Sequence, residues 1–484
     1  MTLRISRDVD LLRHLGLLVA AGVLLTGLVA PVSVVDYRVQ AVLSVFLATI
    51  VLWITKPVPY AISSLFCVIL LYALGLADTF QAAVSGFASS LVFFFFLLLL
   101  VGQSVSKVDL DSWVADRLAF ETSTPRRSIR RLGTALLALA FLMPSGLART
   151  VTFMPVIDQI NDTYDLADDS NFRRLAYYLI GHVNPLASLV VMTGGGMPIT
   201  TSEIINSTVR PFTWLDWVVY MAPPVVLLYT GAVLVASVVY RVSDAVDGSR
   251  SETASASGSE NTVQSNGGAV DPLTRAQKVV VGALLTAIVL WIVGSFVGVP
   301  AIVPAMAVVF VFSLPGVRII TVDDIASVNW GIVFLMGAML SLLDVMQELG
   351  AFEVVIDAMS SSATVFQAGL VTMFVLFCFA VLVRSCFASV SAALVLLLPV
   401  LLEFASALEL DQLYVSLSLP IILGAAVFVP FNVPTVLIAY ERGPLTRTEV
   451  VGLGMMTLVL AFLVVGFGWF VYWPTLEGVL GGAV

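Results

Sequence analysis

The sequence predicts an all-α polytopic membrane protein with about eleven transmembrane helices and two re-entrant hairpins in an inverted repeat. Of its 484 residues, 59% are hydrophobic and 11% are charged, so no soluble core could bury this much apolar surface. The only long polar stretch, residues 242–274, separates two apolar halves of similar length. The pentapeptide Ile50–Ile54 recurs letter for letter as Ile288–Ile292, which indicates that the halves are related.

Apolar runs of about 17 residues or more are candidate transmembrane helices, because a bilayer core needs about that length of helix. Arginines precede the first run, but no cleavage site follows it, so we expect a retained first helix. The candidate spans lie near residues 15–33, 38–55, 58–77, 87–106, 172–196, 214–240, 276–297, 300–316, 329–347, 413–438 and 449–473.

Two further apolar regions, residues 132–160 and 366–405, are interrupted by small or polar residues. The interruption is Pro144–Gly146 in the first region and Arg384–Ser391 in the second. Lipid tolerates irregular backbone only where that backbone lines a cavity or is covered by protein. We therefore expect two re-entrant helical hairpins, each entering and leaving on one side of the membrane.

The distribution of basic residues supports this topology. With the N-terminus in the cytoplasm, only Arg38 and Arg210 fall outside, and Arg149 and Arg384 fall within the hairpins. All the other lysines and arginines lie on the cytoplasmic side, as the positive-inside rule requires. If either hairpin crossed the membrane, this bias would reverse downstream. We expect a multi-pass protein of the cell membrane with an extracytoplasmic C-terminus.

Each half contains five crossings, an odd number, so the second half starts on the opposite side from the first. Such an inverted repeat is typical of secondary transporters, whose sites form where the repeats meet near the membrane midplane. The expected organisation is an N-terminal helix in residues 1–37, a first repeat in 38–241, a cytoplasmic linker in 242–274 and a second repeat in 275–484.

Several short stretches in each half carry a resemblance to a known family. They are Trp53–Pro59, Phe87–Ser90 and Leu110–Asp116 in the first half, and Asn329–Phe334, Phe387–Ser389 and Leu398–Val400 in the second. In these motifs, their order and the hairpin positions, the chain resembles the divalent anion/sodium symporter (DASS) family of the ion transporter superfamily. The resemblance implies transport of dicarboxylates, citrate or sulfate, a homodimer, and a transport domain that slides like an elevator along a fixed scaffold.

The chain departs from this family at the expected cation sites. The family has a Ser-Asn-Thr triplet at each hairpin tip, whereas here the tips read Ser145–Leu147 and Ser389–Ser391. The loops that follow, Met192–Pro198 and Val429–Thr435, lack the family's Pro-Asn ending. Backbone carbonyls can still bind Na⁺, but fewer side-chain oxygens remain. Na⁺ is the coupling ion that the resemblance implies, yet we expect transport to depend on it weakly or not at all.

The resemblance also implies candidate site residues. Apart from Na⁺ as a possible coupling ion, we expect no cofactor, no structural metal and no catalytic residue. The chain has only two histidines and no cluster with metal-ligand spacing. The cation candidates are Ser145, Gly194, Gly195, Ser389 and Asn432. The substrate candidates are Ser145, Gly146, Arg149, Thr150, Thr193, Ser389, Ser391 and Pro434.

Three charged residues within apolar regions have open roles. Arg149 lies four residues after Ser145, and its planar fork suits an anionic substrate, but it could instead cap the hairpin or pair with an internal carboxylate. We expect a structural pairing for Arg384. Asp344 is a candidate proton carrier or arginine partner, or a solvated carboxylate near the surface.

The leading hypothesis is thus a secondary transporter of a small divalent or oligovalent anion. A proton-coupled or exchange-type transporter without sodium is the alternative, as is a non-transporting membrane homologue. An enzyme is not expected, because the chain lacks a convergent catalytic set. The expected partners are the anionic substrate, the lipid bilayer and a second copy of the chain, with no nucleic acid.

Overall fold

The computed structural model of the chain describes residues 2–30, 35–110, 113, 124–141, 145–242, 272–354, 369–387, 389–428 and 433–481. Within these ranges every regular element is a helix and none is a strand. Seven of the described helices are long and apolar enough to cross a membrane, and five shorter apolar helices accompany them. The chain is therefore an all-α polytopic membrane protein, as predicted. Most of the polar linker 242–274 lies outside the described residues.

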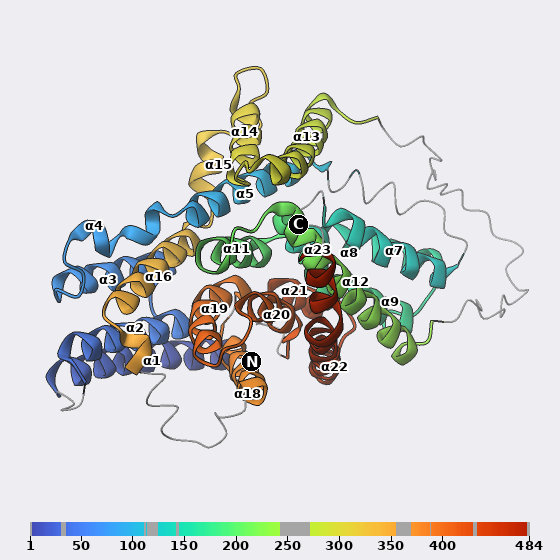
Figure 1. Cartoon of the computed structure of the whole chain (residues 1–484). Helices are drawn as coiled ribbons and strands as arrows, with labels where there is room; N and C mark the ends of the chain where they lie inside the picture. The colour runs from blue at the N-terminus through green and yellow to red at the C-terminus, as the bar shows by residue number, and fades with distance from the viewer. Residues whose placement is uncertain are drawn as a thin grey trace, which may run out of the picture.

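One group of helices, the first block, combines segments from both halves of the chain (Figure 1). The two halves approach closely between Gly86 and α16, where a Cβ at Gly86 would lie 2.3 Å from the Gly337 carbonyl oxygen. The Gly86 N–H also donates to Ser341 Oγ at 2.9 Å. The first block comprises α1 (Thr2–Val29), α2 (Tyr37–Thr55), α3 (Tyr60–Ala73), α4 (Phe80–Ala83), η1 (Ser85–Ala88), α5 (Ser90–Lys107), α13 (Arg275–Val297), α14 (Ile302–Ser313), α15 (Val322–Ser327) and α16 (Trp330–Glu348).

The second block contains two helical hairpins at the predicted places. The first is α7 (Pro125–Leu139) with α8 (Gly146–Thr163), and the second is α18 (Gly369–Ser385) with α19 (Val390–Ala407). The first hairpin begins earlier than the predicted residue 132, because Thr124 caps α7 and Pro125 occupies its first turn, where no N–H is needed. Residues 142–144 of its tip lie outside the described residues.

Two predicted spans are interrupted near the Gly- and Pro-rich loops that the sequence predicted. Residues 172–196 form α9 (Asn171–Tyr178), the π-helix η2 (Leu179–Val183) and α10 (Asn184–Ala187), and the chain then leaves the helix. It continues through η3 (Met192–Gly194) into α11 (Gly196–Ile204) and the π-helix η4 (Ile205–Val209). Gly194 packs here against the Ser188 carbonyl oxygen, which a Cβ would approach to 2.2 Å.

The predicted span 413–438 is likewise two helices, α20 (Gln412–Ala425) and α21 (Pro434–Arg442). Pro434 starts α21, since proline suits a first helical turn but cannot donate an intrahelical hydrogen bond. The other spans match their helices within a few residues, except that α1 begins 13 residues before the predicted residue 15. Both halves of the chain therefore contain the same order of elements, a hairpin followed by a broken helix.

The remaining long helices of the second block are α12 (Trp214–Val239) and α22 (Arg447–Phe467), which continues as η7 (Gly468–Tyr472) into α23 (Trp473–Gly481). A reciprocal Thr–acidic capping box starts α12 at Thr213 and Asp216, and another starts α22. Figure 1 shows α11, α19 and α20 in the middle of the molecule, with α5 and α16 towards one side and α12 and α22 towards the other.

Candidate functional site

A cavity of about 760 Å³ opens at the boundary between the two blocks. Its size is in the range of small-ligand sites in proteins. The first block contributes α5 and the α15–α16 segment, whereas the second contributes the tip of the first hairpin and the start of α11. The lining residues are Phe95, Leu98, Leu99, Gly102, Gln103, Ser106, Lys107, Ser145, Gly195, Gly196, Ile199, Asp324, Ser327 and Asn329.

Two helix N-termini line this cavity, and a third packs against one of them. Ser145 caps α8 by accepting the Ala148 N–H, and both Ser145 and Gly196, the first residue of α11, line the cavity. Ser389 caps α19 in the same way, by accepting the Ala392 N–H at 3.4 Å. The first N–H groups of a helix have no intrahelical partner and carry partial positive charge, so these ends favour an anion.

Gly196 brings the start of α11 against the second hairpin. A Cβ at this position would lie 2.6 Å from Ser391 Oγ and 2.9 Å from Cε2 of Phe95. Gly196 therefore touches the second hairpin on one side and α5 of the first block on the other. This packing joins Ser145, Gly195 and Ser391, three residues that the sequence predicted for the site, in one region.

Arg149 and Thr150 lie behind the first tip and do not line the cavity. The Arg149 guanidinium is fully buried and donates from Nε to Asn184 Oδ1 at 2.7 Å and from Nη2 to Ser188 Oγ at 2.7 Å. Thr150 Oγ1 donates to the Ile180 carbonyl at 2.7 Å. Asn184 Nδ2 completes the network by donating to the Gly146 carbonyl at 2.8 Å. These contacts bind the start of α8 to the broken helix around η2 and α10.

The other predicted residues occupy the margins of this region. Thr193 is buried, and its hydroxyl accepts a hydrogen bond from Trp214 Nε1 at 3.4 Å. Gly194 packs on the Ser188 carbonyl, and Pro434 is an exposed residue at the start of α21. Asn432 lies outside the described residues. Whether any of these binds an anion or a cation stays a prediction.

Sequence reasoning missed the ion pair in the cavity wall. Lys107, at the end of α5, lies 2.6 Å from the Asp324 carboxylate of α15, in the connection between α14 and α16. Burial acts to raise the pKa of Asp324, but hydrogen bonds from Lys107 and Thr321 outweigh it and lower that pKa. The available signal was the rarity of lysine, since Lys107 is one of only three in the chain.

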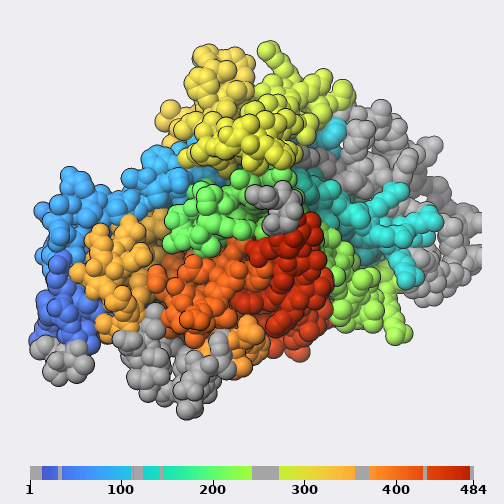
Figure 2. All heavy atoms as spheres, in the orientation of Figure 1, coloured from blue at the N-terminus to red at the C-terminus, as the bar shows by residue number. Residues whose placement is uncertain are grey.

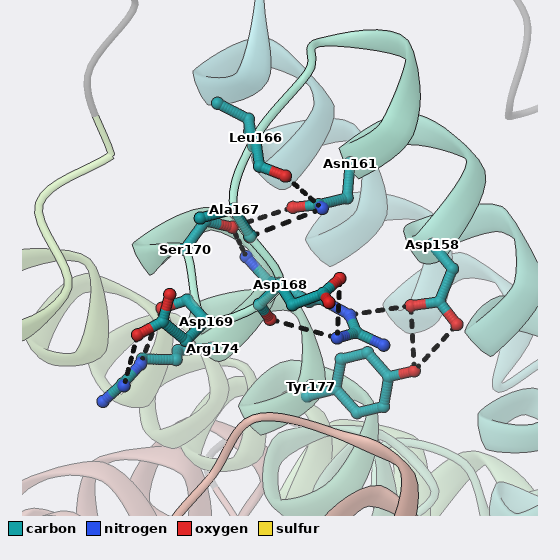
Figure 3. A network of polar contacts seen from close by, with 10 residues as sticks. Asp158, Asn161, Leu166, Ala167, Asp168, Asp169, Ser170, Arg174 and Tyr177 are labelled. Carbon is teal, nitrogen blue, oxygen red and sulfur yellow. Dashed lines mark hydrogen bonds and ion pairs between the residues drawn. The ribbon is translucent and has the colours of Figure 1, made fainter.

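The far end of α8 is anchored by a polar network around the connection to α9 (Figure 3). Asn161 Nδ2 donates to the Leu166 carbonyl at 2.9 Å, and Ser170 Oγ donates to Asn161 Oδ1 at 2.8 Å. Arg173 donates to Asp158 at 2.9 Å, which ties the first turn of α9 to α8. The helix that carries Ser145 is thus held at both ends by side-chain hydrogen bonds.

Two further charged residues of the sequence analysis have structural placements. Arg384 is fully buried at the end of α18, and its Nη1 donates to the Phe387 carbonyl at 2.6 Å, which agrees with a structural role. Asp344 is exposed and accepts a hydrogen bond from Ser85 Oγ at 2.7 Å. This exposed position agrees with a carboxylate near the surface, one of the three roles that the sequence left open.

Comparisons with known proteins agree with this architecture. A relative from Cupriavidus necator, named only as a membrane protein, is 20% identical over 496 aligned residues, covering 95% of this chain and 92% of the relative. The L-tartrate/succinate antiporter of Shigella dysenteriae is 26% identical over 383 residues, covering 76% of this chain and 73% of the relative. The family model of the sodium:sulfate symporter transmembrane region matches residues 11–479. The chain therefore belongs to the sodium:sulfate symporter family, which is a family of membrane anion transporters.

Proposed function

We propose that this chain is a secondary active transporter of small divalent or oligovalent anions of the dicarboxylate, citrate or sulfate type. The observation that carries the proposal is a cavity of about 760 Å³ lined by the N-termini of α8 and α11, with the N-terminus of α19 packed against Gly196. Three sets of free N–H groups give a compact region of positive potential without requiring a metal. Such a region suits a small molecule with two or more negative charges.

In this proposal the Ser145, Ser389 and Ser391 hydroxyls and the N–H groups at Gly146 and Gly196 contact the anion. Arg149 acts from behind the tip, where its bonds to Asn184 and Ser188 fix the start of α8. A direct clamp by Arg149 is a second arrangement, and it requires the guanidinium to leave these partners. Thr150, Thr193 and Pro434 complete the predicted surroundings, and carbonyls at Gly194 and Gly195 are the candidate ligands of a coupling cation, with Asn432.

We further propose that transport uses an elevator movement in a homodimer. The cavity is bounded by both blocks, so sliding of the hairpins and α11 along α5 would carry the site across the membrane. With the N-terminus cytoplasmic, Lys107 lies on the cytoplasmic side, and the present cavity opens inward. A cysteine pair at Phe95 and Gly196 should be bridged by Hg²⁺ in this state, and the bridge should stop whatever transport the unbridged double variant retains. Bridging that leaves transport intact would contradict the sliding movement.

Uptake by proteoliposomes tests the function directly. Purified protein should accumulate labelled succinate, citrate, tartrate or sulfate, and protein-free vesicles provide the control. Replacement of Na⁺ by K⁺ should change the rate little, because the tips lack the family's asparagines. A steep sigmoidal dependence on Na⁺ that Li⁺ and K⁺ cannot replace would refute weak sodium dependence. Absence of both uptake and exchange for all four anions would refute transport of this class.

Exchange is a second candidate mode, favoured by the relative whose name is L-tartrate/succinate antiporter. Vesicles preloaded with unlabelled succinate should then take up labelled tartrate faster than empty vesicles. Equal rates in loaded and empty vesicles would favour net symport instead. The same preparation distinguishes the two modes, since only the internal anion differs between the samples.

A further inference from the structure

Glu203 is a carboxylate in the interior of the molecule, on α11. Its side chain is 9% exposed, and it accepts one hydrogen bond, from Ser90 Oγ to Oε2 at 3.1 Å. Ser90 is the first residue of α5 and so belongs to the first block, whereas α11 belongs to the second. This bond therefore crosses the boundary along which the blocks would slide. No part of the anion site described above includes Glu203.

A separate cavity of about 210 Å³ lies beside this carboxylate. Its walls come from the end of α11 and the start of α12, and from the α13–α14 connection of the first block. Figure 2 shows the surface of α11 directly below that of α13 and α14 on the visible face. Of the described residues that line this cavity, Glu203 alone is charged, and Ser90, Asn206, Thr213 and Ser295 are polar. The cavity is roomy enough for water to reach the carboxylate.

The elements packed around α11 bring no cation to Glu203. On α5 the only charged residue is Lys107, at the opposite end of that helix, where it pairs with Asp324. The only charged residue of α19 is Glu403, near the helix end that is distant from the first turn of α11. The elements η3, η4 and α20 contain no Asp, Glu, Lys, Arg or His. The remaining titratable group of α20 is Tyr414, which donates to Glu477 at 2.7 Å.

Two charged groups near the small cavity are occupied elsewhere. Arg210 lies 3.8 Å from Glu477, and Asp216 accepts hydrogen bonds from Thr213 within its capping box. None of the ion pairs among the described residues includes Glu203. The Ser90 hydroxyl is thus its single polar partner in this conformation.

This environment fits a protonated carboxyl group better than an ionised one. A buried charge needs a counter-ion or several donors to offset the loss of water, and one hydroxyl is a weak substitute. Protonation removes the charge, and the resulting acid can still share a hydrogen bond with Ser90. Ionisable residues inside membrane segments are costly and commonly belong to proton or ion pathways.

On the basis of the proposed transport function, we propose that Glu203 is a proton-binding site through which anion transport is coupled to protons. In the present conformation the carboxyl holds a proton, taken from water in the adjacent cavity, and bonds to Ser90. When α11 moves along α5, the hydrogen bond to Ser90 breaks, and the carboxyl Oε–H bond then breaks as a water molecule accepts the proton. One proton is bound and one is released per cycle, and no electrons are transferred.

The position of Glu203 explains how the two events are linked. α11 begins at Gly196, in the wall of the anion cavity, and carries Glu203 two turns later, at the boundary with Ser90. An ionised Glu203 resists the present conformation, because it would be charged within an interior site that lacks a cation. A protonated Glu203 permits it. Because α11 connects the two places, protonation of Glu203 changes the anion affinity of the cavity. By thermodynamic reciprocity, anion binding then changes the proton affinity of Glu203 by the same factor.

The first test is infrared difference spectroscopy of the purified full chain between acidic and mildly alkaline pH. It needs no substrate. The wild type should show a protonated-carboxyl band that is missing in Glu203→Gln and shifted in Glu203→Asp. The matched control is Asp344→Asn, which removes a carboxylate that also accepts a hydrogen bond from a serine but is exposed to solvent. An unchanged band in Glu203→Gln would overturn the proposal.

The second test measures transport by the same proteins in vesicles, with labelled sulfate and labelled succinate. Sulfate stays a dianion across this pH range, so any pH effect on its transport belongs to the protein. The wild-type apparent affinity should change about tenfold with pH, a typical coupling between linked sites. Glu203→Gln should abolish that dependence and pH-gradient-driven uptake while retaining anion exchange, and Asp344→Asn should retain all three.

These results separate the two proposals. If the wild type moves neither anion, the transport function fails, and the infrared band still decides whether Glu203 binds a proton. If Glu203→Gln transports with the wild-type pH dependence, proton coupling at Glu203 is wrong although transport stands. Loss of exchange in a folded Glu203→Gln protein would also contradict the proposal, because the neutral glutamine imitates the protonated acid and should leave exchange intact.

Discussion

Arg149→Gln should destabilise the protein more than it weakens anion binding. The guanidinium is fully buried and makes two short hydrogen bonds, each of 2.7 Å, to Asn184 Oδ1 and Ser188 Oγ. A hydrogen bond from a charged donor contributes about 1.5–3 kcal/mol, so the two together are worth about 3–6 kcal/mol. The glutamine amide can replace about one of them, and removal of a buried charge offsets part of the loss. We expect the free energy of unfolding to fall by about 2–4 kcal/mol.

The assay compares thermal stability and sulfate and succinate binding on the same purified variant. The control is Arg174→Gln, which removes a partly exposed arginine that lies 2.7 Å from Glu449 and should cost about 0–1 kcal/mol. The stability of Arg149→Lys should fall between those of the wild type and Arg149→Gln. The lysine ammonium keeps the charge but lacks the planar fork with which the guanidinium reaches both acceptors. Normal stability of Arg149→Gln combined with lost affinity for both anions would refute this reasoning and favour a direct clamp.

Two further predictions concern the cavity wall. The pKa of Asp324 is lower in the folded protein than its ordinary value, so its pairing with Lys107 stabilises the fold at neutral pH and is lost as the pH falls through the lowered pKa. In Asp324→Asn the free energy of unfolding should depend less on pH in that acidic range. An unchanged pH dependence, measured by denaturation at a series of pH values, would contradict this prediction. Gly196→Ala should cost about 1–3 kcal/mol and slow transport, because the added Cβ would lie 2.6 Å from Ser391 Oγ. Gly231→Ala on α12, whose Cβ would approach nothing closer than 3.9 Å, should be neutral, and equal melting points for both variants would refute the packing argument.

Much of the helical organisation could be predicted because lipid restricts what a chain can do. Backbone groups in a bilayer must be paired internally, so an apolar run of sufficient length becomes a helix. Ser145 and Ser389 were predicted at the hairpin tips, and the structure adds that each caps the helix that follows by accepting one of its first N–H groups. Hydropathy alone gave 172–196 and 413–438 as continuous spans, whereas the loops Met192–Pro198 and Val429–Thr435 indicated that these helices break.

The partners within the candidate site could not be predicted. Lys107 pairs with Asp324 and Ser90 with Glu203 across separations of 217 and 113 residues, and neither pair has a local signature. In a soluble protein the apolar stripe of a helix identifies its buried face. Here lipid and protein interior are equally apolar, so the helical pattern does not say which face packs inward.

The sequence by itself determined the class of protein, the order of its helices and the two places where hairpins turn. Composition, length and turn chemistry act locally, and the bilayer converts them into helices regardless of their neighbours. Only the tertiary structure decided that Gly196 touches Ser391, that Arg149 is held by Asn184, and that Glu203 faces Ser90 without a cation. Those contacts depend on how far each helix is rotated and shifted against the next, and close packing of small residues such as Gly196 sets that relation.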